Sequence, residues 1–174
     1  SDNTATCTQV VTVIDDNNPT FVGCAAPVSF NVTATGCTVD LADVNLGTPT
    51  VDDNCTTTTV TNDAPASFPL GETTVTWTVT DGSDNTATCT QVVTIIDDID
   101  PTFVSCAAPV SFNVTATGCT VDLADVNLGT PTVDDNCTTT TVTNDAPASF
   151  PLGETTVTWP DTAGSDNTAT CTQV

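Results

Sequence analysis

The sequence contains no lysine, arginine or histidine among its 174 residues. With 22 acidic residues, its formal charge is -22. A chain without cationic side chains cannot neutralise phosphates, which excludes nucleic-acid binding, and anionic membrane surfaces repel it. The commonest general base and the Schiff-base amine are also missing. We therefore expect that the protein is not an enzyme.

Long apolar runs are absent too, and none reaches the roughly 18 residues that a membrane span needs. We therefore expect no membrane insertion. Aromatic residues make up only 5% of the chain, but 38% of it is hydrophobic, which is enough for a core. The nine cysteines have no histidine beside them to complete a zinc site. They predict disulfides and an oxidising compartment, either extracellular or at the cell surface.

The sequence repeats itself with a period of 82 residues. The segment SDNTATCTQV begins at Ser1, Ser83 and Ser165, and residues 24–77 are identical to residues 106–159. Only seven positions differ across the whole unit. Such uniformity is expected of an array of equivalent units. We interpret the chain as a window of a longer periodic polymer.

Inside each unit, apolar residues alternate with polar ones, as they do in β-strands. Val75, Trp77 and Val79 are separated by threonines, which gives one apolar and one polar face. Glycine- and proline-containing turns separate the expected strands, which cover residues 26–33, 36–42, 56–62, 73–80 and 86–96. Short strands at this spacing, with no amphipathic helix between them, predict an all-β fold of tandem immunoglobulin-like antiparallel β-sandwiches arrayed end to end.

The repeat also predicts the domain boundaries. One sandwich is expected over residues 15–98 and a second over residues 99–174. Residues 1–14 are expected to be the final strand of a preceding sandwich, with an exposed edge and an apolar stripe. Whether successive units form one polypeptide or exchange this strand as separate subunits stays open.

One segment of the second copy conflicts with this pattern. Pro160 and Asp161 replace Thr78 and Val79 of the first copy. Proline removes a hydrogen-bond donor from a central strand, and the aspartate takes a core-facing position. We expect either that the strand ends early there or that the terminal segment is incorrectly represented.

Four stretches of the sequence resemble the hyalin repeat family. They are Val-Asp-Asp-Asn-Cys at 51–55, Phe-Pro-Leu-Gly-Glu-Thr-Thr-Val-Thr-Trp at 68–77, Asp-Asn-Thr-Ala-Thr-Cys-Thr-Gln-Val-Val-Thr at 84–94 and Asp-Asp-Ile-Asp-Pro-Thr-Phe-Val-Ser-Cys at 97–106. The resemblance covers the whole chain. It implies an immunoglobulin-like sandwich, arrayed in extracellular or bacterial cell-surface proteins, with adhesive or structural roles and no catalytic residues.

The resemblance, together with the expected strand order, also implies how the cysteines pair. The implied bridges in the first copy are Cys24 with Cys89 and Cys37 with Cys55. Those in the second copy are Cys106 with Cys171 and Cys119 with Cys137. Cys7 is left for an upstream neighbour.

Acidic and amide side chains are expected to gather at one end of each sandwich, where the N-terminal linker and two loops meet. In the first copy they are Asp15, Asp16, Asn18, Asp52, Asp53, Asn54, Asp81, Asp84 and Asn85. In the second copy they are Asp97, Asp98, Asp100, Asp134 and Asp135, with Asp161 or Asp166 as an open choice because Ala163 replaces Asp81.

Oxygen ligands in flexible loops favour Ca²⁺ over Mg²⁺. The alternative is that these residues only form turns. We favour Ca²⁺ because no cationic side chain is available to offset the carboxylates.

The triplets at Asn31 and Asn113 match the N-glycosylation pattern on the expected outer face of a strand, although such triplets arise by chance in a threonine-rich chain. Two functions remain in competition. The first is a repeat unit of an extracellular filament, stalk or cell-surface fibre, whose partners are copies of itself. The second is an adhesin repeat that binds glycans or a partner protein. Nearly invariant loops between the copies favour the first.

Resistance to trypsin follows from the composition alone. Trypsin cleaves after lysine or arginine, and the chain has neither. Prolonged incubation of the unfolded, reduced chain with trypsin should leave its intact mass unchanged, whereas chymotrypsin should fragment it at the aromatic residues. Tryptic fragments in mass spectrometry would contradict this prediction.

Overall fold

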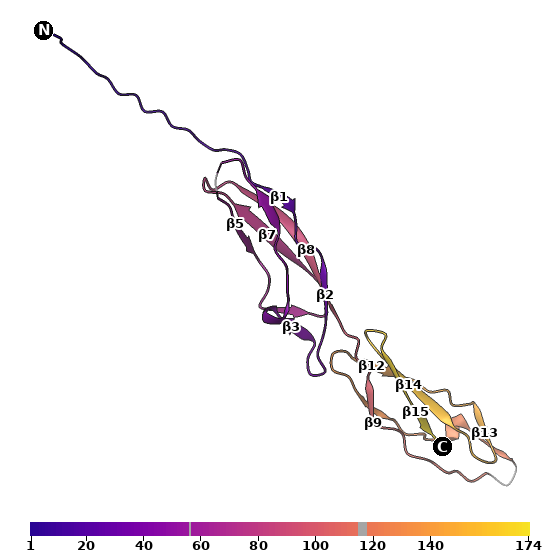
Figure 1. Cartoon of the computed structure of the whole chain (residues 1–174). Coiled ribbons are helices and arrows are strands. Elements are labelled where there is room, and N and C mark those ends of the chain that lie inside the picture. The colour runs from indigo at the N-terminus through magenta and orange to yellow at the C-terminus, as the bar shows by residue number, and fades with distance from the viewer. Residues whose placement is uncertain (56, 115–117) are drawn as a thin grey trace. The chain divides into compact units, whose positions relative to one another are not determined.

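The computed structural model describes residues 1–55, 57–114 and 118–174, and it is all-β apart from two 3₁₀ turns, as predicted (Figure 1). The elements of the first copy are β1 (Thr20–Gly23), β2 (Val28–Asn31), β3 (Thr38–Asp40), η1 (Leu41–Asp43), β4 (Thr50–Asp52), β5 (Thr59–Asn62), β6 (Ser67–Pro69), β7 (Gly71–Thr80) and β8 (Thr86–Ile96). Those of the second copy are β9 (Thr102–Ser105), β10 (Thr120–Asp122), η2 (Leu123–Asp125), β11 (Thr132–Asp134), β12 (Thr140–Val142), β13 (Ser149–Pro151), β14 (Val157–Ala163) and β15 (Thr168–Gln173). In the part of the chain that the structure describes, no helix has the length and apolar character needed to cross a membrane.

The sheets of the two copies follow the same order. In the first copy a four-stranded sheet runs β2-β8-β7-β5, and β1 pairs with β4 and β3 with β6 (Figure 1). In the second copy the corresponding sheet is β12-β14-β15, β9 pairs with β11 and β10 with β13. This architecture is consistent with two tandem immunoglobulin-like domains. The expected strand at 56–62 begins at Thr59, and Thr56 lies outside the described residues.

The long strands bury one face, as the alternation of the sequence predicted. Val75, Trp77 and Val79 of β7 and Val93 of β8 are all buried, while the residues between them are more accessible. In the second copy Trp159 belongs to a buried cluster with Ala107 and Val157. The cluster is completed by Phe103, Leu128, Val142, Ala146, Phe150 and Cys171.

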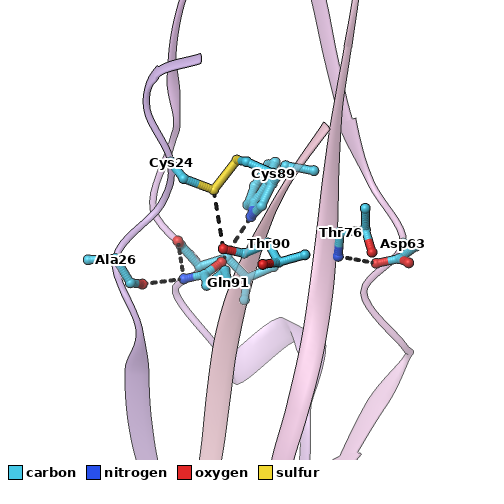
Figure 2. Close-up of a disulfide and its surroundings, with 9 residues drawn as sticks. Cys24, Ala26, Asp63, Thr76, Cys89, Thr90 and Gln91 are labelled. Atoms are coloured by element: carbon cyan, nitrogen blue, oxygen red, sulfur yellow. Dashed lines mark hydrogen bonds between the residues drawn. A yellow bond between two sulfur atoms is a disulfide. The ribbon is translucent and has the colours of Figure 1, made fainter. Parts of the chain in front are cut away.

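A buried glutamine connects three segments of the first copy. Gln91 of β8 accepts a hydrogen bond from Trp77 Nε1 (3.0 Å) and donates from Nε2 to the carbonyls of Ala26 (2.6 Å) and Leu46 (3.0 Å). Figure 2 shows this side chain beside the disulfide between Cys24 and Cys89. A buried amide must satisfy both its donors and its acceptor, so this glutamine fixes the segments in register. Sequence alternation alone did not indicate this role.

Two compact units emerge from the packing of the chain. The first comprises Ser1–Val28, Leu41–Ala66 and Glu72–Thr94, and the second comprises Ser29–Asp40, Ser67–Gly71 and Ile95–Val174. The second unit therefore includes two segments of the first sequence copy. The domain boundaries 15–98 and 99–174 stay a prediction, as does the role of residues 1–14 as a strand. In the structure residues 1–14 form no strand, and the side chains of Val10 and Val13 are about nine-tenths exposed.

The disulfides confirm half of the expected pairs. Cys24 is bonded to Cys89 (Figure 2) and Cys106 to Cys171, each across 65 residues of sequence. The expected pairs Cys37–Cys55 and Cys119–Cys137 are not formed, because all four are free thiols. Cys37 and Cys55 belong to different compact units. The sequence pattern predicted the strands, but it did not predict which cysteine-bearing loops lie close together in the folded chain.

Strand β14 does not end at Pro160, so the expected early end is wrong. It runs from Val157 to Ala163, and the Pro160 carbonyl accepts a hydrogen bond from Thr143 N (3.0 Å). Asp161 points inward and is 0% exposed, and neither of its carboxyl oxygens has a hydrogen-bond partner. The second copy therefore buries an unsatisfied carboxyl group where the first has Val79.

Replacing Asp161 with valine should stabilise the protein. The substitution restores the residue of the first copy and removes two buried oxygens without partners, a gain of about 1–3 kcal/mol. The matched control is Val79→Asp, which should destabilise the chain by a comparable amount or more. Thermal unfolding of both variants measures this, and a lower melting temperature for Asp161→Val would contradict the account.

Candidate metal centre

Three carboxylates from separate parts of the first copy converge on one point. Asp15 precedes β1, Asp53 follows β4 and Asp81 follows β7, and one oxygen of each lies within 4.8 Å of the others. The pairing of β1 with β4 carries the first two residues to the same place. Asp15 and Asp53 are half-buried and Asp81 is buried. The sequence predicted this convergence.

The turn after β7 fixes the Asp81 side chain. Its Oδ1 accepts hydrogen bonds from the backbone N–H groups of Ser83 and Asn85, both at 2.8 Å, and its Oδ2 accepts one from Asn85 Nδ2 at 2.8 Å. Burial raises the pKa of this carboxyl, but the hydrogen bonds from Asn85 and Ser83 outweigh it and lower the pKa below its ordinary value of 3.8. Asp81 is therefore held as a carboxylate in a fixed orientation.

Asn85 also connects this turn to the segment before β1. Its Nδ2 donates to the backbone carbonyl of Asp15 at 3.2 Å. Asp15 Oδ1 accepts from Asn17 N at 3.2 Å, while Asp15 Oδ2 is buried without a hydrogen bond of ordinary geometry. An unsatisfied carboxylate oxygen facing two further carboxylates is the arrangement that a bound cation would complete.

The negative charges of these carboxylates affect the pKa of the neighbouring Cys55 thiol. Desolvation, followed by the charges of Asp15 and Asp53, raises the pKa of Cys55 above 9.0. A thiol kept protonated in this way is a poor nucleophile and a poor metal ligand. The site therefore offers oxygen ligands, which suit a hard divalent cation.

Other predicted ligands of the first copy lie beside the three carboxylates or away from them. Asn18, Asp52 and Asn54 line an adjoining cleft with Asn17, Thr20 and Asp53. Asp16 is exposed, and it is not part of the three-carboxylate group. Asp84 is in the left-handed conformation (φ 68°) within the turn, and its N–H donates to the Asp81 carbonyl.

The second copy assembles a different site from the corresponding residues. Asp97 is buried and Asp135 half-buried, but Ala163 takes the place of the third aspartate. The Ser165 hydroxyl donates to Asp97 Oδ2 at 3.3 Å, and Asn167 Nδ2 donates to the Asp97 carbonyl at 3.0 Å. The sequence reasoning missed this serine.

One carboxylate oxygen of Asp135, Oδ2, is bonded within its own loop, while Oδ1 is buried without a hydrogen-bond partner. Its Oδ2 accepts hydrogen bonds from Thr138 N (2.7 Å), Thr138 Oγ1 (3.0 Å) and Cys137 N (3.1 Å). Burial raises the pKa of Asp135, but these hydrogen bonds outweigh it and lower the pKa. The spacing of aspartate and threonine three residues apart is the sequence signal of such a turn.

The remaining predicted ligands of the second copy do not join a group of three among the described residues. Asp98 accepts a hydrogen bond from Asn31 Nδ2 at 2.7 Å, and Asp100 is exposed. Asp134 lies in β11 and is exposed. Asp161 lies in the core, so its assignment as a ligand is wrong. Asp166 is in the left-handed conformation (φ 64°) within the turn after β14, and its N–H donates to the Ala163 carbonyl.

Both predicted glycosylation positions are exposed. Asn31 lies at the end of β2, and the same amide nitrogen that would carry a glycan donates to Asp98. Asn113 is exposed outside any strand, and Thr115 of its triplet lies outside the described residues. Glycosylation at either position stays a prediction.

The comparisons with known proteins found one family model that matches part of the chain. Residues 15–95 match the family model described as HYR domain. A solved structure of PcdhgB3 EC1-4 is 15% identical, with a TM-score of 0.30, and the match covers 92% of this chain. Protocadherin Gamma B7 extracellular cadherin domains 1-4 are 11% identical over 91% of this chain, with a TM-score of 0.31. This chain spans 50% of the length of each of those two chains.

The lowered pKa of Asp81 predicts a pH dependence of stability. Because its folded pKa lies below 3.8, its stabilising effect is complete above about pH 5 and is lost as the pH falls through the folded pKa. In calcium-free buffer, the melting temperature of the unmodified protein should fall more steeply between pH 5 and pH 2 than that of Asp81→Asn. Glu72→Gln, at an exposed position, should follow the unmodified protein. Parallel curves for Asp81→Asn and the unmodified protein would contradict the assignment.

Proposed function

We propose, on the premise that residues 15–95 form an HYR domain, the hyalin repeat, that this protein is a structural repeat unit of an extracellular filament, stalk or cell-surface fibre. The disulfides support an extracellular location. The proposal assigns no catalytic role to the chain. Its partners are further copies of the same unit.

The observation that carries the proposal is the position of the disulfide in each copy. Cys24–Cys89 and Cys106–Cys171 each join residues 65 positions apart, close to the two ends of a copy. Tension along the chain therefore passes through the bridge and bypasses most of the folded residues. A unit built in this way transmits force without unravelling, which is what a fibre requires and a freely diffusing binding protein does not.

Calcium is the second part of the proposal. The three carboxylates of the first copy, with the buried Oδ2 of Asp15, supply hard oxygen ligands, and the chain has no cationic side chain to offset their charge. Asp15, Asp53 and Asp81 would hold the ion, and the amide nitrogen of Asn85 orients Asp81. The ion would tie the segment before β1 to the loops after β4 and β7, and so stiffen that end of the unit.

An adhesin repeat that binds glycans is the competing function. The near-identity of the two copies argues against it, because recognition loops usually diverge between repeats. Binding of the folded chain to an array of glycans tests it directly. Saturable binding at micromolar concentration, lost when the loop at 81–85 is altered, would favour the adhesin over the structural unit.

The difference between the copies predicts how much calcium is bound. Isothermal titration calorimetry should give one Ca²⁺ per chain, because the second copy has Ala163 in place of the third aspartate. Asp81→Ala should abolish binding, since it gives the first copy the same gap. Ala163→Asp should raise the stoichiometry to two.

These variants are matched, because each converts one copy into the other at a single position. Circular dichroism should show the same β-sheet content in all of them. A stoichiometry of two for the unmodified chain, or no heat of binding at millimolar Ca²⁺, would contradict the calcium site while leaving the disulfide argument untouched.

A further inference from the structure

Two of the free cysteines meet within the second compact unit although they belong to different copies of the sequence repeat. Cys37 precedes β3 in the segment Ser29–Asp40, and Cys137 follows β11. Both are half-buried. They are separated by a full repeat period plus 18 residues, so no spacing within one copy would have indicated the pair.

The contact between them is reciprocal. The Cys37 thiol donates to the carbonyl of Asn136 at 2.9 Å, and the Cys137 thiol donates to the carbonyl of Gly36 at 3.3 Å. Each sulfur therefore lies against the backbone that immediately precedes the other cysteine. Each thiol therefore points toward the loop that carries the other cysteine.

Both loops are fixed by further hydrogen bonds. Asn136 Nδ2 donates to the carbonyl of Thr33 at 3.3 Å, and the same carbonyl accepts the N–H of Gly36 at 3.2 Å. On the other side, Asp135 Oδ2 accepts the N–H of Cys137 at 3.1 Å. The cysteines are thus presented by two ordered turns and not by free chain ends.

The pKa of Cys137 is consistent with a position close to Cys37. Burial, followed by a hydrogen bond and charge interaction with Cys37, raises the pKa of Cys137 to about 12. A hydrogen bond and a charge interaction between the two thiols require them to lie close together. A structural metal is a poorer explanation, since zinc sites of this kind use four ligands and no group of metal ligands among the described residues includes these thiols.

We propose that Cys37 and Cys137 form a disulfide that covalently joins adjacent copies of the repeat. Formation removes one proton and one electron from each thiol. A disulfide oxidant such as glutathione disulfide accepts the two electrons: one cysteine attacks it and releases one glutathione, and the second cysteine attacks the mixed disulfide and releases the other. This proposal rests on the contact geometry and not on the proposed calcium site.

The same kind of bridge would give partners to two of the remaining free cysteines of the repeat. Cys119 occupies the position of Cys37 in the second copy, and Cys55 occupies the position of Cys137 in the first. In an array, each would find its partner in a neighbouring copy. Every junction would then carry one bridge, in addition to the bridge inside each copy.

Labelling of free thiols tests the proposal on the unmodified chain. The protein is oxidised with glutathione disulfide, isolated as a monomer, unfolded without reductant and treated with iodoacetamide before its intact mass is measured. Of the nine cysteines, three should take a label, namely Cys7, Cys55 and Cys119. Five labels would overturn the proposal, because Cys37 and Cys137 would then both be free.

Variants are needed to identify the pair, because residues 53–62 and 135–144 have identical sequences and give the same peptide. Three matched chains each retain the two observed bridges and two further cysteines, all others being serine. The chain that keeps Cys37 and Cys137 should take no label. The chains that keep Cys37 with Cys55, or Cys55 with Cys119, should each take two.

Two labels on the first of these chains, or none on the second, would overturn the assignment. Label counts above two in any of them report loss of Cys24–Cys89 or Cys106–Cys171, and so identify a variant that has not folded. In that event five labels on the unmodified chain, or one, overturn the proposal, because one label means that Cys37 and Cys137 have each paired within their own copy. Loss of calcium binding would not alter any of these counts, so failure of the calcium proposal is distinguishable from failure of this one.

Discussion

The disulfide that closes each copy is the constraint on which the rest of the structure depends. Cys24–Cys89 encloses β7 with its buried tryptophan, and Cys106–Cys171 encloses β14 with the corresponding tryptophan. In the chain-entropy view, closing loops of this length stabilises the folded state by about 4 kcal/mol each. That is a large fraction of the stability of a domain with so few aromatic residues. The buried glutamine next to the bridge then holds the segments at Ala26 and Leu46 against β8.

The strands were largely predictable because the signal is local. Alternation of apolar residues with threonine marks β7 and β8 directly, and the buried faces follow it. The convergence of Asp15, Asp53 and Asp81 was predictable too, since loops at one end of an immunoglobulin-like sandwich meet. The path of β14 was not predictable, because tertiary pairing with β12 and β15 keeps Pro160 in a strand that its own propensity opposes.

The failures share a physical cause. The pairs Cys37–Cys55 and Cys119–Cys137 were implied by the resemblance and the expected strand order within one copy, and contacts between residues of different copies cannot be predicted from one copy. In an array of near-identical units, the contacts at a junction are hard to predict from the sequence. Each residue that makes such a contact has an identical counterpart in another copy that does not make it.

The most direct test of the structural role is a force-extension measurement on the oxidised chain, held at its two ends. If tension passes through the two bridges, each removes 65 backbone steps from the load path. The chain should then extend to only about 150 Å at roughly 3.5 Å per residue, and reduction should lengthen it to about 600 Å. Extension of the oxidised chain to the full unfolded length would contradict the account.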